Sequence, residues 1–491
     1  MPGIVGINRL GVGSLTANPQ VQFPLRASSS GRYLVDSNGK PFRAHGEQHW
    51  LAPMSFSAAD FQAVINVLAS QGINSVTMMA ICHDYEEHTG KTPGTGPQSQ
   101  AGFWPFGLDT TGAAYAGTGI SSPPNGSTPL ATIWADFSTA STQSSYWSVI
   151  DNALSVCLAA GIVVFFFPAY MGYQGKIEGW AADKFESGST KCATYGTFLG
   201  NRYKGQRNII WMMGGDFDPS TWNSSYSGLV TCEEQMFLAI RAAGANQIIG
   251  GHFPYHNGLA SDISNTSSTL AALVGINTVY AWLNEESMYQ QPLAAWGFSP
   301  PIPALLHDPG SAYEGSGPSE LTNRQDWWWG AVSSVGGQMM GNQPDWYSGS
   351  GTFASVNTSS GMLSTGHTQH QYRGQFFNAV PWWKLLPEGQ GGMGTIVTSG
   401  NGTNGNTDWI TASADPAGSL LVAYIPDAHS GAFTVSLTTF TSSHIVGAWY
   451  DPTNGTYAPT SGSPYSGSSQ SFTVPGANSA GNNDWVLMLT A

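Results

Sequence analysis

The sequence is poor in charged residues. Only 9% of its 491 residues are Asp, Glu, Lys or Arg, against about 25% in an average soluble domain. Acidic residues outnumber basic ones by 30 to 16, so the formal net charge is −14. No dense run of Lys and Arg occurs, which argues against a nucleic-acid backbone or an anionic membrane as partner. We expect the solvent-exposed surface to consist mainly of the uncharged residues Ser, Thr, Asn, Gln and Gly. Such a surface is typical of an extracellular or particle-associated protein.

Long apolar runs are missing as well. The longest candidate, residues 161–169, has the length of a buried strand and falls far short of the roughly 18 residues of a membrane-spanning helix. We therefore expect no membrane insertion. Residues 1–20 hold a single Arg and no continuous apolar segment, so they do not resemble a secretory signal. If the protein acts outside a cell, we expect a trimmed chain or another route of exit.

Cysteine is scarce, and its spacing matches no metal site. The four residues Cys82, Cys157, Cys192 and Cys232 form no CxxC pair. They allow three disulfide pairings, which the spacing does not separate, and four reduced core cysteines are the alternative. Cys192–Cys232 is the first pair to examine, because both fall on neighbouring expected helices. No GxSxG or Walker motif occurs, and no GxGxxG follows the first expected strand, so we expect neither a metal nor an organic cofactor.

Short apolar runs alternate with helix-like stretches through most of the chain. Eight runs read as strands: residues 42–49, 74–82, 161–170, 208–216, 247–256, 278–285, 303–308 and 336–341. Amphipathic stretches lie between them, including residues 57–71, 146–160 and 232–243, and the first has Ser57 as a plausible N-cap. Eight such repeats predict a closed (β/α)8 TIM barrel, in the α/β class. A doubly wound open sheet is the rival, but it would normally carry a Gly-rich nucleotide turn.

The chain divides into four parts that differ in composition and hydrophobic pattern. We predict an N-terminal arm over residues 1–22, a barrel over 23–387, a Gly-rich linker over 388–408 and a small all-β sandwich over 409–491. The arm could dock to a larger assembly. Five sandwich strands are expected at residues 420–425, 433–437, 445–450, 471–474 and 486–489. A long insertion, residues 89–128, follows the second barrel strand.

Polar and aromatic residues follow the expected barrel strands, where the active site of a TIM barrel lies. Carboxylates can perform acid, base or nucleophilic work on a glycosidic bond, and aromatic faces can pack on sugar rings. The carboxylates considered for catalysis are Asp216, Asp308 and Glu314. The residues considered for substrate contact are Glu47, His49, Trp50, His83, Tyr170, His252, His256, Trp282 and Glu285. A zinc pair is not expected at His252 and His256, because they lie on a strand end and no HExxH pattern occurs.

Four motifs, taken in order, resemble the apiosidase-like glycoside hydrolases. They are GRYLVDSNGKPF at residues 31–42 with Trp50 after it, NIIWMMGGD at 208–216, PWWKLLP at 381–387 and WYDPTNG at 449–455. The last resembles a C-terminal sandwich of the collagen-binding type. The resemblance covers residues 23–491 and implies a (β/α)8 barrel that acts on glycosidic bonds, with catalytic carboxylates after strands four and seven.

The resemblance assigns roles to three carboxylates. Asp216 matches the strand-four general acid/base, with a helix cap as the alternative reading. The strand-seven pattern, Glu-Pro-x-Tyr-Glu, appears here as DPGSAYE at residues 308–314, so Asp308 is the nucleophile candidate and Glu314 its substitute. Asp is one methylene shorter than Glu, so this replacement can change the distance between the two catalytic carboxyl groups. That distance is about 5–5.5 Å in retaining enzymes and 6.5–9.5 Å in inverting ones. At strand one, Glu47-Gln48-His49-Trp50 stands where the family usually has Asp-Thr-x-Trp, which indicates a shifted sugar specificity.

The sequence therefore predicts an extracellular or particle-associated glycoside hydrolase that cleaves a plant or bacterial polysaccharide by a two-carboxylate mechanism. The alternative is a non-catalytic carbohydrate-binding or structural component of a virion or cell surface, which the altered strand-seven motif and the Gly-rich arm would fit. The separation and exposure of the carboxylates discriminate between the two.

Overall fold

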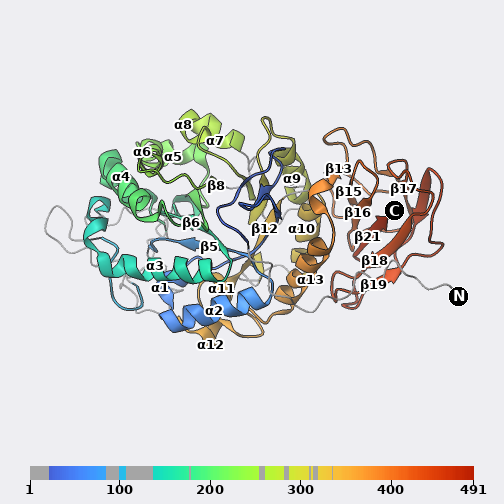
Figure 1. Ribbon diagram of the computed structural model, residues 1–491, viewed down its shortest axis with the longest axis horizontal. Helices are drawn as coiled ribbons and strands as arrows, with labels where there is room; N and C mark the ends of the chain where they lie inside the picture. The colour runs from blue at the N-terminus through green and yellow to red at the C-terminus, as the bar shows by residue number, and fades with distance from the viewer. Residues whose placement is uncertain are drawn as a thin grey trace.

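The computed structural model describes two packed domains, a barrel and a β-sandwich (Figure 1). The described residues are 21–83, 99–106, 136–175, 179–253, 260–280, 287–308, 311–312, 319–333 and 336–491. Nearly all of the expected N-terminal arm and most of the insertion at residues 89–128 lie outside them. Within the described ranges, no helix is both long and apolar enough to cross a bilayer.

Eight parallel strands form the barrel wall. In chain order they are β4 (Ala44–Gln48), β5 (Ser75–Met79), β6 (Val163–Phe167), β7 (Ile209–Gly214), β8 (Ile249–His252), β9 (Asn277–Tyr280), β10 (Ala304–Asp308) and β12 (Gly337–Asn342). They pair in the order β8-β7-β6-β5-β4-β12-β10-β9, and a bridge from Ile249 to Val274 joins the two ends. Each strand lies within one of the eight predicted runs, apart from the first residue of β9 and the last residue of β12, so the (β/α)8 fold is confirmed.

The most apolar strands show that both faces of the barrel wall are covered. All five residues of β6, sequence VVFFF, are buried between the barrel interior and the outer helices. A sheet with one wet face would instead alternate polar and apolar side chains. This is why the sequence shows short continuous apolar runs, and why the ends of those runs mark the catalytic rim.

Helices cover the outside of the barrel (Figure 1). The longer ones are α2 (Ala58–Ser70), α3 (Ser144–Ala159), α4 (Ala181–Tyr203), α6 (Leu229–Ala242), α9 (Ser287–Gly297), α10 (Glu320–Val332) and α13 (Thr365–Ala379). The shorter ones are α1 (Ala52–Ser55), α5 (Trp222–Ser225), α7 (Ala260–Thr266), α8 (Ser268–Ala271), α11 (Gln343–Trp346) and α12 (Phe353–Val356). The predicted cap of α2 is confirmed, since the Ser57 hydroxyl accepts the Asp60 N–H at 3.1 Å.

Small sheets complete the barrel domain. β1 (Arg26–Ala27), β2 (Leu34–Val35) and β3 (Pro41–Phe42) form an antiparallel sheet. The β2–β3 hairpin turns at Asn38-Gly39, where Gly39 has φ +82°. β11 (Ser311–Ala312) pairs with the end of β12.

The C-terminal domain is a sandwich of two antiparallel sheets. One sheet has the order β13-β15-β16-β21-β18-β19 and the other β14-β17-β20. Their bounds are β13 (Leu386–Pro387), β14 (Val397–Ser399), β15 (Thr411–Ala414), β16 (Leu420–Ile425), β17 (Phe433–Ser436), β18 (Val446–Tyr450), β19 (Tyr457–Pro459), β20 (Ser469–Phe472) and β21 (Trp485–Thr490). The five predicted strands are all present. The predicted linker, residues 388–408, differs from the structure, because β14 within it pairs with β17.

The two domains share a buried interface. Helices α10 and α13 lie between the barrel and the sandwich (Figure 1), and Trp328 of α10 packs on Tyr424 and Tyr450 of the larger sheet. The Arg324 guanidinium binds both carboxylate oxygens of Asp484 at 2.7 Å, with both side chains buried. This buried bidentate ion pair and the aromatic packing hold the sandwich against the barrel.

Candidate active site

Asp216 stands at the carboxyl end of β7, on a turn that only glycine permits. Gly214 and Gly215 have φ +81° and +152°, and a Cβ on Gly215 would lie 2.8 Å from the Met171 nitrogen and from the Tyr170 ring. The Gly215 N–H donates to the His252 carbonyl at 3.0 Å. The predicted position of Asp216, after a strand and on the catalytic rim, is therefore the position that the structure shows.

Two side chains hold the Asp216 carboxylate. The Tyr170 hydroxyl donates to Oδ2 at 2.9 Å, and Nδ1 of His252 lies 3.0 Å from Oδ1. Tyr170 and His252 are buried, whereas the side chain of Asp216 is 21% exposed. The carboxyl group is thus fixed from behind and open in front, which is the geometry that proton transfer to a bound substrate needs.

Aromatic and imidazole rings fill the barrel mouth behind this group. The Trp50 ring centroid is 4.8 Å from that of Phe167, 5.2 Å from Tyr170 and 5.6 Å from His252. The Trp50 indole N–H donates to Gln48 Oε1 at 3.3 Å. Among the predicted residues, the structure therefore brings Asp216, Tyr170, His252 and Trp50 together.

His307 and Gln48 belong to the same group, although neither was predicted as a site residue. The His307 ring lies 4.8 Å from that of His252, and its Nε2 is 3.1 Å from the Thr77 hydroxyl. The Gln48 amide donates to the His307 carbonyl at 2.9 Å. Burial holds the pKa of His307 well below its usual range, and nearby His252 adds to the effect. His307 is therefore neutral; the strand-end position of both residues was the signal that could have identified them.

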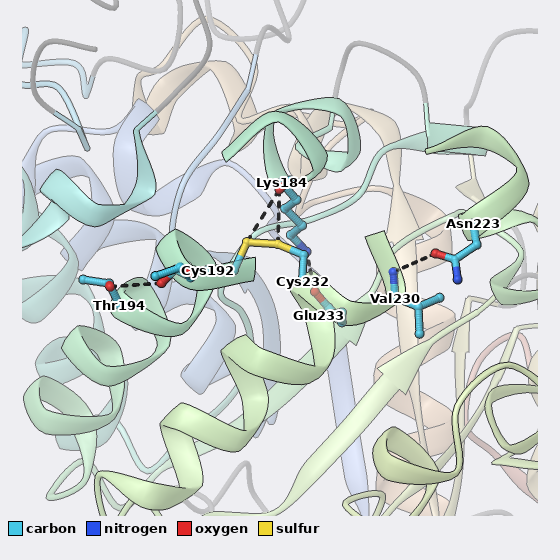
Figure 2. Close-up of a disulfide and its surroundings, with 8 residues drawn as sticks. Lys184, Cys192, Thr194, Asn223, Val230, Cys232 and Glu233 are labelled. Atoms are coloured by element: carbon cyan, nitrogen blue, oxygen red, sulfur yellow. Dashed lines mark hydrogen bonds and ion pairs between the residues drawn. A yellow bond between two sulfur atoms is a disulfide. The ribbon is translucent and has the colours of Figure 1, made fainter. Parts of the chain in front are cut away.

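A buried ion pair supports the turn that carries Asp216 (Figure 2). Glu233 of α6 accepts the Gly214 N–H through Oε1 at 3.1 Å and binds Lys184 Nζ through Oε2 at 2.7 Å. Both charged side chains are 1% exposed. Burial lowers the pKa of Lys184, and the Glu233 carboxylate opposes that shift. Two outer helices are thereby linked to the end of β7.

A disulfide joins the same two helices. Cys192 of α4 is bonded to Cys232 of α6, next to Glu233, and the Lys184 carbonyl oxygen lies 3.2 Å from the Cys232 sulfur (Figure 2). The pair singled out from sequence is therefore confirmed, and the alternative of four reduced cysteines is wrong. Cys82 and Cys157 are buried and form no disulfide.

Glu47 and His49 lie in a different place from the Asp216 group. Both are buried, and the Glu47 carboxylate lies 2.8 Å from Nε2 of His367 on α13 and 3.3 Å from Nε2 of His49. Neighbouring strand residues point to opposite faces, so Gln48 and Trp50 join the barrel mouth while Glu47 and His49 pack outward. The structure therefore does not bring Glu47 and His49 together with the Asp216 group; both are buried, and Glu47 lies against His367.

The charges around Glu47 are strongly coupled. Burial opposes ionisation of Glu47, but His367 and His49 hold its pKa at about 2. Burial likewise opposes charge on His367, and Glu47 raises its pKa to about 9. Asp345 of α11 lies 3.5 Å from the same imidazole, and burial raises its pKa to about 6. This cluster of Glu47, His49, Asp345 and His367 ties β4 to α11 and α13.

His83 is likewise buried. Its Nε2 lies 2.8 Å from the Asp183 carboxylate, and its ring meets Trp180 edge-on with centroids 4.6 Å apart. The structure therefore places this predicted contact residue against the start of α4, apart from the Asp216 group.

The second carboxylate can be placed only by its strand. Asp308 is the last residue of β10 and pairs with Tyr280 of β9. Because the carboxyl ends of parallel barrel strands share one rim, Asp308 stands on the same rim as Asp216. The Asp308 side chain and the predicted residues His256, Trp282, Glu285 and Glu314 lie outside the described part of the structure. Among the described residues, no three His, Cys, Asp or Glu side chains are grouped to hold a metal ion.

Two family models match the chain. Residues 28–384 match "Apiosidase-like, catalytic domain", and residues 395–490 match "Putative collagen-binding domain of a collagenase". No curated protein matches the sequence. These two matches follow the barrel and the sandwich, including β14.

Solved structures share the whole architecture at low sequence identity. A glycoside hydrolase is 15% identical with a TM-score of 0.68, covering 95% of this chain and 97% of its own. A family 5 glycoside hydrolase from Bacteroides vulgatus is 16% identical with a TM-score of 0.68, covering 95% and 93%. A third, described as a glycoside hydrolase from the same organism, is 9% identical with a TM-score of 0.63, covering 97% and 83%. These likenesses establish the fold.

The family match extends over most of the chain, from residue 28 to residue 384. The chain belongs to the apiosidase-like family, and its barrel is the catalytic domain of a glycoside hydrolase.

Proposed function

We propose that the protein cleaves glycosidic bonds in a plant or bacterial polysaccharide outside the cell, with Asp216 as the general acid/base. The second carboxylate is Asp308 or, failing it, Glu314. The observation that carries the proposal is the Asp216 carboxyl group, which is held by Tyr170 and His252 and is open to solvent at the catalytic rim.

In the proposed reaction, Asp216 gives its proton to the glycosidic oxygen as the bond from that oxygen to the anomeric carbon breaks. The second carboxylate either attacks the anomeric carbon or removes a proton from the water that attacks it. Tyr170 and His252 fix the carboxyl group throughout, and the buried imidazole keeps a proton-binding nitrogen 3.0 Å from Oδ1. Correct orientation of a positioned acid contributes as much as its presence does.

Two observations support a site of action outside the cell. The Cys192–Cys232 disulfide is typical of proteins in an oxidising compartment. The surface is also unusually poor in charge, with 9% charged residues in the sequence. A polysaccharide, which offers hydroxyl groups and no phosphate, is the substrate class that suits a net charge of −14.

The test is release of reducing sugar from a panel of plant and bacterial polysaccharides. We compare the wild type with Asp216→Asn and with the matched control Asp218→Asn. Asp218 lies on the same loop but caps the turn at residues 219–221, where its carboxylate accepts the Ser220 N–H at 2.9 Å. Loss of a positioned acid should lower the rate roughly 10²–10⁴-fold, and the control should stay within a few-fold of wild type. If Asp216→Asn cleaves as fast as wild type, Asp216 is not the acid; if the wild type cleaves nothing yet binds glycan, the protein is a binding component.

A further inference from the structure

The loop after β6 exposes an aromatic ring beside the candidate acid. Tyr173 is 49% exposed, which makes it the most exposed aromatic side chain among the residues that the structure describes. It lies in the short turn Tyr173–Gly175 between β6 and α4. An exposed ring offers an apolar face to a ligand, and what distinguishes Tyr173 from other exposed rings is its place in the chain next to the Asp216 loop.

Backbone contacts tie this loop to Asp216 itself. The Gln174 N–H donates to the Asp216 carbonyl at 2.7 Å, and the Met171 N–H donates to the Gly214 carbonyl at 3.1 Å. Tyr173 is therefore one residue away from a direct contact with the residue that carries the acid. Its position relative to Asp216 is set by hydrogen bonds rather than by a long free loop.

Side chains from the chain segment after Asp216 also pack against this loop. A Cβ on Gly175 would lie 2.6 Å from the Phe217 ring, so the backbone is pressed against the residue that follows Asp216. The Tyr226 hydroxyl donates to the Gly175 carbonyl at 2.8 Å. The platform that carries Tyr173 is thus a packed part of the rim.

Strain at Gln174 marks the loop as more than a connection. Gln174 has φ 54° and ψ 28°, in the left-handed region that residues other than glycine seldom occupy. Its side-chain amide donates to the Tyr173 hydroxyl at 3.1 Å. Such conformations persist where the surrounding structure enforces them, and they concentrate at ligand sites. Here the strained residue both binds the Asp216 carbonyl and holds the exposed phenol.

We propose that Tyr173 is a stacking platform for the sugar ring on the leaving-group side of the scissile bond. This inference rests on the proposed role of Asp216. A general acid must lie about 2.6–3.2 Å from the oxygen it protonates, and that oxygen belongs to the leaving sugar. The leaving sugar is therefore the part of the substrate nearest the loop after β6, which is hydrogen-bonded to Asp216. The C–H face of a sugar ring packs on the face of an exposed phenol, whose hydroxyl stays hydrated at its edge.

The test compares Tyr173→Ala with Tyr173→Phe and with Trp383→Ala. Trp383 is an exposed aromatic residue in the segment Trp382–Lys384, near the sandwich, and so controls for the loss of any surface ring. On a polysaccharide that the wild type cleaves, Tyr173→Ala should lower kcat/KM by roughly 2- to 12-fold, the range set by one aromatic stacking contact. Tyr173→Phe keeps the ring and should stay within about twofold of wild type, as should Trp383→Ala.

A substrate without a leaving sugar locates the contact. The probe is a glycosyl fluoride made from the sugar whose anomeric carbon the wild type attacks. In this substrate the leaving group is a fluoride ion, so no sugar ring lies on the leaving-group side. Tyr173→Ala should cleave this fluoride as fast as wild type does. Equal losses on the polysaccharide and on the fluoride would assign Tyr173 to the other side of the bond, and no loss on either would overturn the platform altogether.

A binding measurement keeps this inference separate from the proposed function. We measure retardation by the same polysaccharides in affinity electrophoresis for Asp216→Asn and for Asp216→Asn/Tyr173→Ala. Weaker retardation of the double variant supports the platform even if no polysaccharide is cleaved, in which case the proposed function alone fails. Equal retardation of the two proteins, both folded by circular dichroism, overturns the platform.

Discussion

The buried Lys184–Glu233 pair offers a sharp test of how the Asp216 turn is held. In Lys184→Met the Glu233 carboxylate stays in a fully buried position and keeps its hydrogen bond from the Gly214 N–H. Removing one member of a buried pair leaves an uncompensated charge, which costs about 3–5 kcal/mol. We expect the unfolding free energy of Lys184→Met to fall by that amount. Methionine fills most of the space of the lysine chain, so lost packing adds little.

A second substitution separates charge from packing. Glu233→Gln in the Lys184→Met background removes the unpaired charge, yet its amide oxygen can still accept the Gly214 N–H. Replacing both members of a buried pair by neutral groups is often close to neutral for stability. The double variant should therefore regain at least half of the loss.

The assay is urea unfolding followed by tryptophan fluorescence, with circular dichroism as a second probe. Lys184→Met should also lose activity beyond its loss of stability, because Glu233 holds the nitrogen two residues before Asp216. The control is Lys191→Met on the same helix. Lys191 is 32% exposed and its Asp136 partner also accepts from Ser138, so we expect a loss of only about 1 kcal/mol. A loss under about 1 kcal/mol for Lys184→Met, or no recovery in the double variant, would refute the reasoning.

Three further predictions concern the framework around the site. Cys192→Ala/Cys232→Ala opens a loop of 40 residues, so unfolding in urea should show a loss of up to about 4 kcal/mol, and treatment of the wild type with dithiothreitol should reproduce it. Arg324→Met leaves the buried Asp484 carboxylate without its guanidinium partner, so the free energy of unfolding should fall by about 3–5 kcal/mol. Calorimetry should then show the sandwich unfolding in a transition separate from that of the barrel. A single unchanged transition would contradict this. Because Glu47 raises the pKa of His367 to about 9, above the usual value near 6.5, the stabilisation is complete below pH 6.5 and is lost as the pH rises through 9. Urea midpoints of the wild type should fall over that range, and Glu47→Gln should abolish that fall.

Local patterns in the sequence predicted much of the fold. The eight apolar runs match the eight barrel strands, and the five short sandwich runs match β16, β17, β18, β20 and β21. These patterns are readable because a strand covered on both faces must be apolar along its length. The Ser57 cap was also predicted, since capping depends on a few neighbouring residues.

Position on the rim was predicted better than orientation. Asp216, Tyr170, His252 and Trp50 meet as their strand ends suggested. Glu47 is only one residue away from the inward-facing Gln48, yet it packs against His367 of α13. Which strand residues face the barrel interior depends on how the sheet closes.

The supports of the site were decided by tertiary structure alone. Glu233 reaches Gly214, and Lys184 reaches Glu233, only because α4 and α6 pack side by side against β7. The strained Gln174 and the exposed Tyr173 likewise depend on the approach of two separate loops. The sequence alone determined where strands, helices and turns form, because those choices are made among near neighbours. The contacts that orient the Asp216 carboxyl group join residues far apart in the chain, so only the closed barrel could decide them.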